Sequence, residues 1–105
     1  MVQNNQIIDL IKLIAHQYLP DAQVLLFGSR ARNQFRNDSY YDILLVIDKN
    51  LSPKEKIPII TKIRKSLLQS EIRSDILIQS KNEVEKNKNL PGHIIWSILK
   101  EAIIL

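Results

Sequence analysis

Apolar residues follow two patterns along this chain, helical stripes and short continuous runs. The first stripe predicts an amphipathic helix over residues 4–18 and consists of Ile7, Leu10, Ile11, Ile14 and Tyr18. Pro20-Asp21 ends this helix. Three continuous apolar runs predict strands at 22–27, 41–47 and 73–78, and the second is apolar on both faces beyond Asp42.

The second half of the chain carries helix start signals. Ser52-Pro53-Lys54-Glu55 has the form of a capping box with proline at the first helical position. The helix that it opens should reach about Gln69, with a kink or a late start at Pro58. Its inward residues should be Ile60, Ile63, Leu67 and Leu68.

A second capping-box pattern, Ser80-Lys81-Asn82-Glu83, opens a polar stretch over residues 80–89, which predicts either a short exposed helix or a loop. Residues 93–102 read as a final helix, and residues 103–105 as a short edge strand. The resulting order, α-β-turn-β-α-β-α, predicts an α/β (α+β) fold in which a small mixed β-sheet packs against helices. The pattern leaves parallel and antiparallel pairing open.

Length and composition narrow the class of protein. The 105 residues favour a single domain, 1–105, and the absence of cysteine excludes disulfides and thiolate metal sites. No signal peptide or membrane span is expected, which suits a cytoplasmic protein. The net charge of +4 fits a polyanionic ligand such as a nucleotide or RNA, or simply a basic solvated surface.

The turn after the first predicted strand has the features of a phosphate site. Gly28 lets the backbone turn sharply and approach a ligand closely, and Ser29 adds a hydroxyl donor. Arg30 and Arg32 supply fixed positive charge, and a helix that begins here would present its N–H groups. We therefore expect Gly28, Ser29, Arg30 and Arg32 to bind the phosphates of a nucleoside triphosphate. A plain turn is the alternative.

Two aspartates lie at the start of apolar strands, where a charge without a partner costs free energy. Asp42 begins the run ILLVI, and Asp75 begins ILI. If both strands present these residues at the same end, the carboxylates form a hard oxygen site of the kind that Mg²⁺ uses together with substrate phosphates. The alternative for each aspartate is a strand-end cap or a surface ion pair.

These residues resemble the signature of the polymerase-beta-like nucleotidyltransferases. The family pattern is Gly-Ser, ten residues, then Asp-x-Asp, and its minimal bacterial members often read Gly-Ser-Arg-Ala-Arg, as residues 28–32 do. A third family aspartate lies on a later strand, in the setting of Asp75. The resemblance implies the nucleotidyltransferase (polymerase beta palm-like) fold and transfer of a nucleoside monophosphate from NTP to a hydroxyl group.

Under this resemblance Asp42 and Asp75 are the metal-binding and catalytic residues. In the family, the first two aspartates hold two Mg²⁺ ions on the triphosphate, and the third binds one ion and helps to deprotonate the attacking hydroxyl. The first aspartate is replaced here by Tyr40, a poor Mg²⁺ ligand because a phenol is neutral at pH 7. Strand alternation predicts that Tyr40 faces the same way as Asp42. Asp38 has the same parity but lies further out.

Two functions from different classes follow. The first is a weak or degenerate Mg²⁺-dependent nucleotidyltransferase that uses NTP. The second is an impaired, antitoxin-like binding module, because minimal nucleotidyltransferases commonly pair with a helical toxin of the HEPN class. A nucleic-acid-binding domain that draws on the positive charge is a third, weaker hypothesis.

Overall fold

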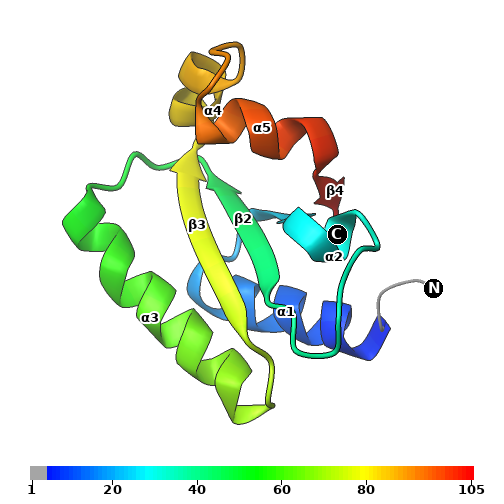
Figure 1. Ribbon diagram of the computed structural model, residues 1–105. Helices are drawn as coiled ribbons and strands as arrows, with labels where there is room; N and C mark the ends of the chain where they lie inside the picture. The colour runs from blue at the N-terminus through cyan, green and yellow to red at the C-terminus, as the bar shows by residue number, and fades with distance from the viewer. Residues whose placement is uncertain (1–4) are drawn as a thin grey trace.

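The computed structural model describes residues 5–105 as one small sheet with helices around it (Figure 1). The elements follow one another in the order expected from the sequence. They are α1 (Asn5–Tyr18), β1 (Gln23–Phe27), α2 (Gly28–Ala31), β2 (Tyr41–Ile47), α3 (Pro53–Gln69), β3 (Ser74–Ser80), α4 (Lys81–Asn87), α5 (Ile94–Glu101) and β4 (Ile103–Ile104).

The sheet is mixed, with the strand order β3-β2-β1-β4. β1 pairs antiparallel with β2 and with β4, whereas β2 and β3 run parallel and are joined through α3. The register pairs Phe27 with Asp42 and Asp42 with Asp75. The end of β1 and the beginnings of β2 and β3 therefore meet at one end of the sheet.

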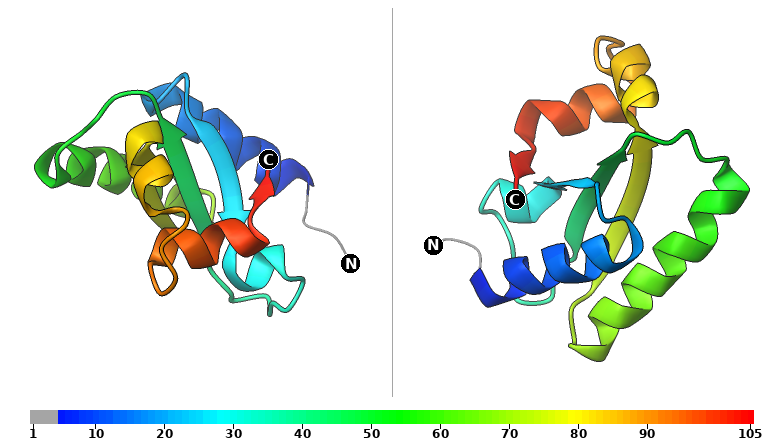
Figure 2. Two further views of the ribbon diagram at one scale, coloured as in Figure 1. Left: turned by 90° about the horizontal axis from the view of Figure 1, so that it is seen from above. Right: turned by 180° about the vertical axis from the view of Figure 1, so that it is seen from behind.

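Alternation along β2 divides its residues between two apolar layers. Ile43, Leu45 and Ile47 belong to the larger cluster, which includes residues of α1 and α3. Leu44 and Val46 pack in a smaller cluster with Ile95 and Ile98 of α5. Both faces of the sheet are therefore covered over part of their area, and Figure 2 shows α1 and α3 on one side and α5 on the other.

The local start signals form as the sequence predicts. Both capping boxes are present, with Ser52 and Glu55 at the start of α3 and Ser80 and Glu83 at the start of α4. The stretch 80–89 thus contains a short helix, and α3 runs without interruption through Pro58.

Several boundaries and one inward residue differ from the prediction. The strand expected at 73–78 extends to Ser80, and the first helix begins within the described residues at Asn5, so that residue 4 lies outside them. Leu68 is 58% exposed, so its predicted inward position is wrong. Ile63 and Leu67 already fill the buried stripe of α3, and Leu68 lies off that stripe. None of the helices within residues 5–105 is long and apolar enough to cross a membrane.

Candidate functional site

Gly28 makes the sharp turn from β1 into α2. Its φ of +75° is in the left-handed region, which glycine adopts without strain. A Cβ atom at this position would collide with the carboxylate of Asp42, so the absent side chain gives that carboxylate its space. Ser29 follows within α2 and is partly buried. The predicted glycine turn is present, and it lies directly against the first predicted aspartate.

Asp42 and Asp75 are neighbours across the parallel pair β2–β3. Asp42 is partly buried and Asp75 is exposed. Burial raises the pKa of Asp42 above its usual 3.8, the negative charges of Asp75 and Glu101 raise it further, and Arg32 opposes them. The sequence prediction that both strands present an aspartate at the same end is therefore consistent with the register.

Glu101, at the end of α5, is a third carboxylate in this region, and the sequence analysis missed it. Its Oε2 accepts a hydrogen bond of 2.7 Å from the backbone N–H of Gly28. Both of its carboxylate oxygens accept from Arg32 Nη1, at 2.8 and 3.0 Å. Glu101 thus engages two of the groups that the sequence assigns to phosphate binding. These contacts join residues that lie about 70 positions apart, and no local motif signals them.

Glu101 is held as an anion by these contacts. Burial raises the pKa of Glu101, but the hydrogen bonds from Arg32 and Gly28 outweigh that effect, and the pKa is lower than its usual 4.5. The side chains of Arg32 and Glu101 are 46% and 28% exposed, so solvent screens their ion pair in part. At this turn a carboxylate accepts hydrogen bonds from a backbone N–H and a guanidinium, so the turn can accommodate negative charge.

Arg30 has a different environment from Arg32. It is only 7% exposed, and its guanidinium lies over the rings of Phe35 and Tyr41, 4.3 and 4.2 Å from their centroids. It also donates to the backbone carbonyl of Ser39 at 2.9 Å. Arg30 therefore holds the loop that leads into β2. Its guanidinium is thus engaged by this loop, whereas the sequence predicts that it binds phosphate.

Tyr40 and Asp38 lie before β2, which begins at Tyr41. Asp38 is an exposed residue of the loop. Tyr40 is 42% exposed and lines a pocket beside α3, where neither Asp42 nor Asp75 is among the lining residues. Whether residue 40 replaces a metal ligand stays a prediction. Across residues 5–105, no group of three or more His, Cys, Asp or Glu side chains is placed to hold a metal ion.

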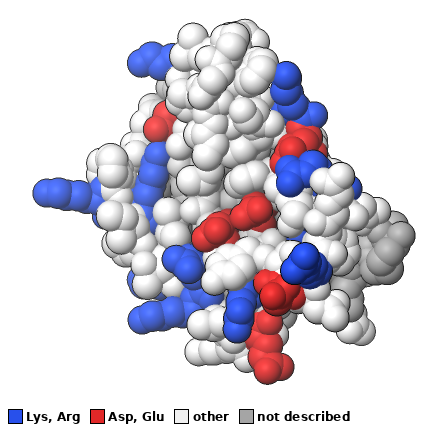
Figure 3. All heavy atoms as spheres, viewed as in Figure 1, with Lys and Arg blue, Asp and Glu red and all other residues white. Residues whose placement is uncertain are grey.

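Charge is unevenly distributed over the face of the molecule that Figures 1 and 3 show. Figure 3 shows acidic side chains near the middle of the face, with basic side chains around them. This mixture suits a cation held together with a polyanion better than it suits either alone.

Comparisons with known proteins identify the family and the fold. The family described as "Polymerase beta, Nucleotidyltransferase" matches residues 9–105. No curated protein matches the chain. A solved structure of a Sulfolobus solfataricus protein, named there as a proposed nucleotidyltransferase, has the same fold, with a TM-score of 0.53 and 20% identity over 94% of this chain and 76% of that one. The chain is a member of the polymerase beta nucleotidyltransferase family.

Proposed function

We propose that the chain transfers a nucleoside monophosphate from NTP to a hydroxyl group, with weak activity, at the end of the sheet where Gly28, Asp42 and Asp75 meet. One observation carries the proposal. Two aspartates are cross-strand neighbours beside a glycine turn whose missing Cβ makes room for one of them. Such a pair of like charges at the start of buried strands has a cost in free energy, which a functional role accounts for.

The donor set fits Mg²⁺. This ion is commonly bound by one or two carboxylates together with substrate phosphates, and Asp42 and Asp75 provide two carboxylates. Burial, and then the negative charges of Asp75 and Glu101, raise the pKa of Asp42, and a bound cation would offset the part of this effect that comes from those charges. When bound, the ion would stabilise charge on the phosphates and on the attacking and leaving oxygens. Tyr40 stands in the position of the first aspartate of the family motif, and the absence of that carboxylate is the reason to expect weak activity.

The phosphate donors are the backbone N–H of Gly28, the hydroxyl of Ser29 and the guanidinium of Arg32. Two of these groups contact Glu101 in this structure. The triphosphate would therefore take over hydrogen bonds that the Glu101 carboxylate now accepts. Nucleotide binding and the position of the end of α5 are coupled in this proposal.

Calorimetric titration with ATP tests the proposal, in the presence of Mg²⁺ and in EDTA. Wild type should bind ATP more tightly with the metal, and Asp75→Asn should lose most of that difference. Asp21→Asn is the matched control, because Asp21 is also an exposed aspartate but lies in the turn before β1. Equal metal dependence in Asp75→Asn and wild type would refute the assignment of the metal site.

A binding module is the second candidate, and exposed apolar residues near the C-terminal end favour it. Leu90, Ile94, Ile103 and Ile104 are 51%, 55%, 44% and 64% exposed. These residues precede, begin or follow α5, and apolar side chains exposed together in this way are typical of a contact surface for a partner. The partner implied by the family resemblance is a helical protein of the HEPN class.

Purification from the native host, followed by mass spectrometry, separates the two candidates. A binding module should be recovered with a helical partner, and Ile94→Lys together with Ile104→Lys should release it. Metal-dependent ATP binding should persist in that double variant if the site at Gly28 is independent of the partner. Recovery of the chain as a lone monomer at native concentration would count against the binding module.

A further inference from the structure

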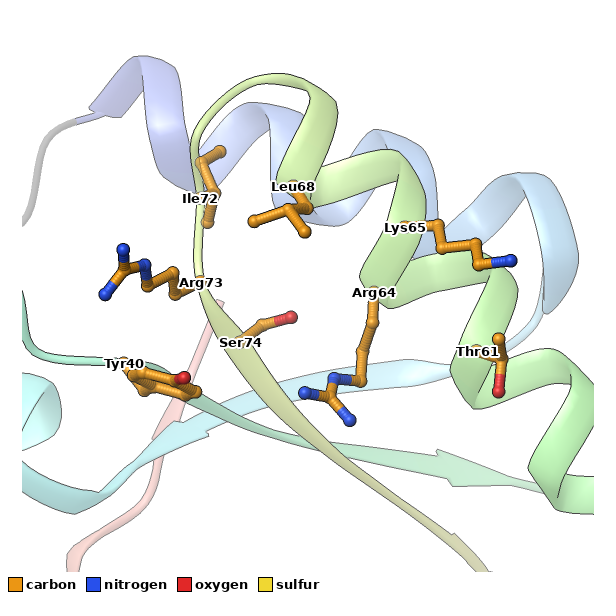
Figure 4. A pocket seen from close by; sticks show the side chains of 8 residues that line it. All are labelled: Tyr40, Thr61, Arg64, Lys65, Leu68, Ile72, Arg73 and Ser74. Carbon is orange, nitrogen blue, oxygen red and sulfur yellow. The ribbon is translucent and has the colours of Figure 1, made fainter.

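A second region of the molecule has a chemistry that the aspartate site does not use. An open pocket of about 500 Å³ lies between α3 and the beginning of β3 (Figure 4). This volume lies in the range of small-molecule sites. Of the eight residues that line the pocket, three are cationic, Arg64, Lys65 and Arg73, and none is acidic.

The three cations have no ion-pair partner among the described residues. The ion pairs within residues 5–105 involve Arg32, Lys56, Lys81 and Lys88 instead. In Figure 4 the guanidinium of Arg64 reaches from α3 toward β3, whereas Lys65 and Arg73 extend away to opposite sides. Arg64 is thus the central positive group of the pocket, and the other two lie at its margins. Like charges gathered in this way attract an anion.

Ser74 supplies an independent sign of a ligand. This residue is 3% exposed, and its Oγ is the one buried side-chain polar atom within residues 5–105 that has no hydrogen-bond partner. Buried hydroxyls normally have a partner, because an unmade hydrogen bond costs about 1–3 kcal/mol. Figure 4 shows this hydroxyl on the same side of β3 as the Arg64 guanidinium. An acceptor that lies between the two would satisfy both.

The remaining walls suit an aromatic ring. Tyr40, a residue that is 42% exposed, presents its ring, Leu68 and Ile72 add apolar surface, and Thr61 adds a hydroxyl. A cationic groove with an aromatic ring is the combination that proteins use to hold nucleotides without reading their sequence. Inorganic anions would use the cations alone and leave Tyr40 without a role.

We propose that this pocket is a second nucleotide site, in which a phosphate group lies against Arg64 and Ser74 and a base lies against Tyr40. It is separate from the aspartate site, because successive side chains of a strand point to opposite faces of the sheet. Asp75 follows Ser74 on β3 and therefore lies on the other face, beside Asp42. The ligand needs no metal here. It is either a free mononucleotide or one nucleotide of a single-stranded RNA.

NMR titration in EDTA tests the proposal, with AMP and an adenylate hexanucleotide as probes. The proposed transfer depends on Mg²⁺, so EDTA removes it, and the NMR shifts of residues 28, 29 and 32 report any remaining binding at that site separately from binding in this pocket. Residues 40, 61, 64 and 74 should show saturable shifts. Arg64→Gln should weaken AMP binding about tenfold, as expected for the loss of one charge-assisted hydrogen bond. Asp21→Asn, a change outside both sites, should leave it unchanged.

Two further variants keep the test independent of folding. Lys62→Gln is the matched charge control, because Lys62 lies on the same helix about 200° away from Arg64. It should weaken binding less than twofold. Ser74→Ala should weaken binding several-fold without lowering the melting temperature, because its hydroxyl makes no hydrogen bond within the fold.

The outcomes decide the proposal. Equal affinity for AMP and the hexanucleotide supports a free mononucleotide, whereas tighter hexanucleotide binding with a salt dependence reduced by Arg64→Gln supports RNA. Absence of saturable shifts with both probes overturns the proposal. Equal losses in Arg64→Gln and Lys62→Gln also overturn it, because they would reflect net charge alone.

Discussion

The aspartate site and the basic pocket lie close together along the chain but have opposite charge. The first contains Asp42 and Asp75, and the second contains Ser74 with cations around it. Ser74 and Asp75 are consecutive residues at the start of one strand. Because successive side chains of a strand point to opposite faces, one step along β3 changes both the face and the chemistry.

The environments of the two regions differ as well. One acidic group beside the aspartate site, Glu101, already accepts hydrogen bonds from Gly28 and Arg32. The cations of the basic pocket have no ion pair within the described part of the chain. The aspartate site is therefore shaped by internal contacts that a ligand must replace, whereas the basic pocket offers groups that no internal partner uses. Variants of the aspartate site should therefore change the free energy of unfolding, whereas variants of the basic pocket should change ligand binding and leave stability nearly unaffected.

Gly28→Ala should give the largest effect, because it breaks the aspartate site from within. Alanine is strained at a φ of +75°, and its Cβ would also collide with Asp42. We expect a loss of about 2–4 kcal/mol in the free energy of unfolding, from backbone strain plus displacement of the aspartate. Chemical denaturation measures it.

Gly92→Ala is the control for backbone strain alone. Gly92 has a φ of +87°, but a Cβ there would have nothing within 4 Å. This variant should lose only about 1 kcal/mol. Similar losses in the two variants would mean that the collision with Asp42 is relieved cheaply, and that Gly28 is needed for its conformation only.

Arg30→Met should have the next largest effect and should disturb both regions. Arg30 lies over Tyr41, the residue between Tyr40 of the basic pocket and Asp42 of the aspartate site. Loss of the guanidinium leaves the carbonyl of Ser39 without this donor. We expect a loss of about 1–3 kcal/mol in chemical denaturation. Arg36→Met, an exposed change in the same loop, should stay within about 0.5 kcal/mol of wild type.

Arg30 and Arg32 show how much of the candidate site can be predicted from the sequence. Gly28, Asp42 and Asp75 could be singled out as one candidate site, because the spacing of the family motif and the position of each aspartate at the start of an apolar run are visible in the sequence. Arg30 and Arg32 look equivalent in the sequence, yet one is buried against aromatic rings and the other contacts Glu101. Side chains two residues apart in a helical turn point in directions about 200° apart, and the sequence does not give the neighbours that lie there.

The fold was predictable for a related reason. Capping boxes and apolar runs are local signals, and they gave β2 and α3 their observed bounds. Pro58 left the continuity of α3 open, and that was decided by the packing of Ile63 and Leu67 in the core. Glu101 was not predictable, since its contacts depend on how α5 returns to the turn at Gly28. Contacts between distant segments are tertiary, and a single sequence carries little information on them.

Glu101→Gln should make the two phosphate donors that Glu101 contacts, the N–H of Gly28 and the guanidinium of Arg32, more available to a ligand. The neutral amide weakens the contact with Arg32 and leaves less negative charge beside Asp42. We expect Mg-ATP to bind about fivefold more tightly, which corresponds to an exposed ion pair worth about 1 kcal/mol. Calorimetry measures it, with Glu85→Gln, a change in the exposed pair with Lys88, as the control. Weaker binding would show instead that Glu101 itself serves the ligand.

Asp42→Asn should give the smallest effect, and its sign is opposite to that of the other stability changes. The pKa of Asp42 is raised in the folded protein, so between pH 3.8 and that raised value the folded state binds more protons than the unfolded state. The free energy of unfolding contributed by this group therefore falls as the pH rises through this window, and it stays low above it.

The asparagine variant lacks this penalty and should be more stable at pH 7, by less than about 1 kcal/mol because Asp42 is only partly buried. Its advantage should shrink toward pH 4, where the wild-type carboxyl is increasingly protonated. Adding Mg-ATP should reverse the order at pH 7, since a ligand that binds only the folded wild type stabilises it alone. Thermal melts at the two pH values measure these differences. If Asp42→Asn is less stable than wild type at pH 7 without ligand, then the Asp42 carboxylate is a structural acceptor for its neighbours, and the unbalanced charge that motivates the metal site is not present.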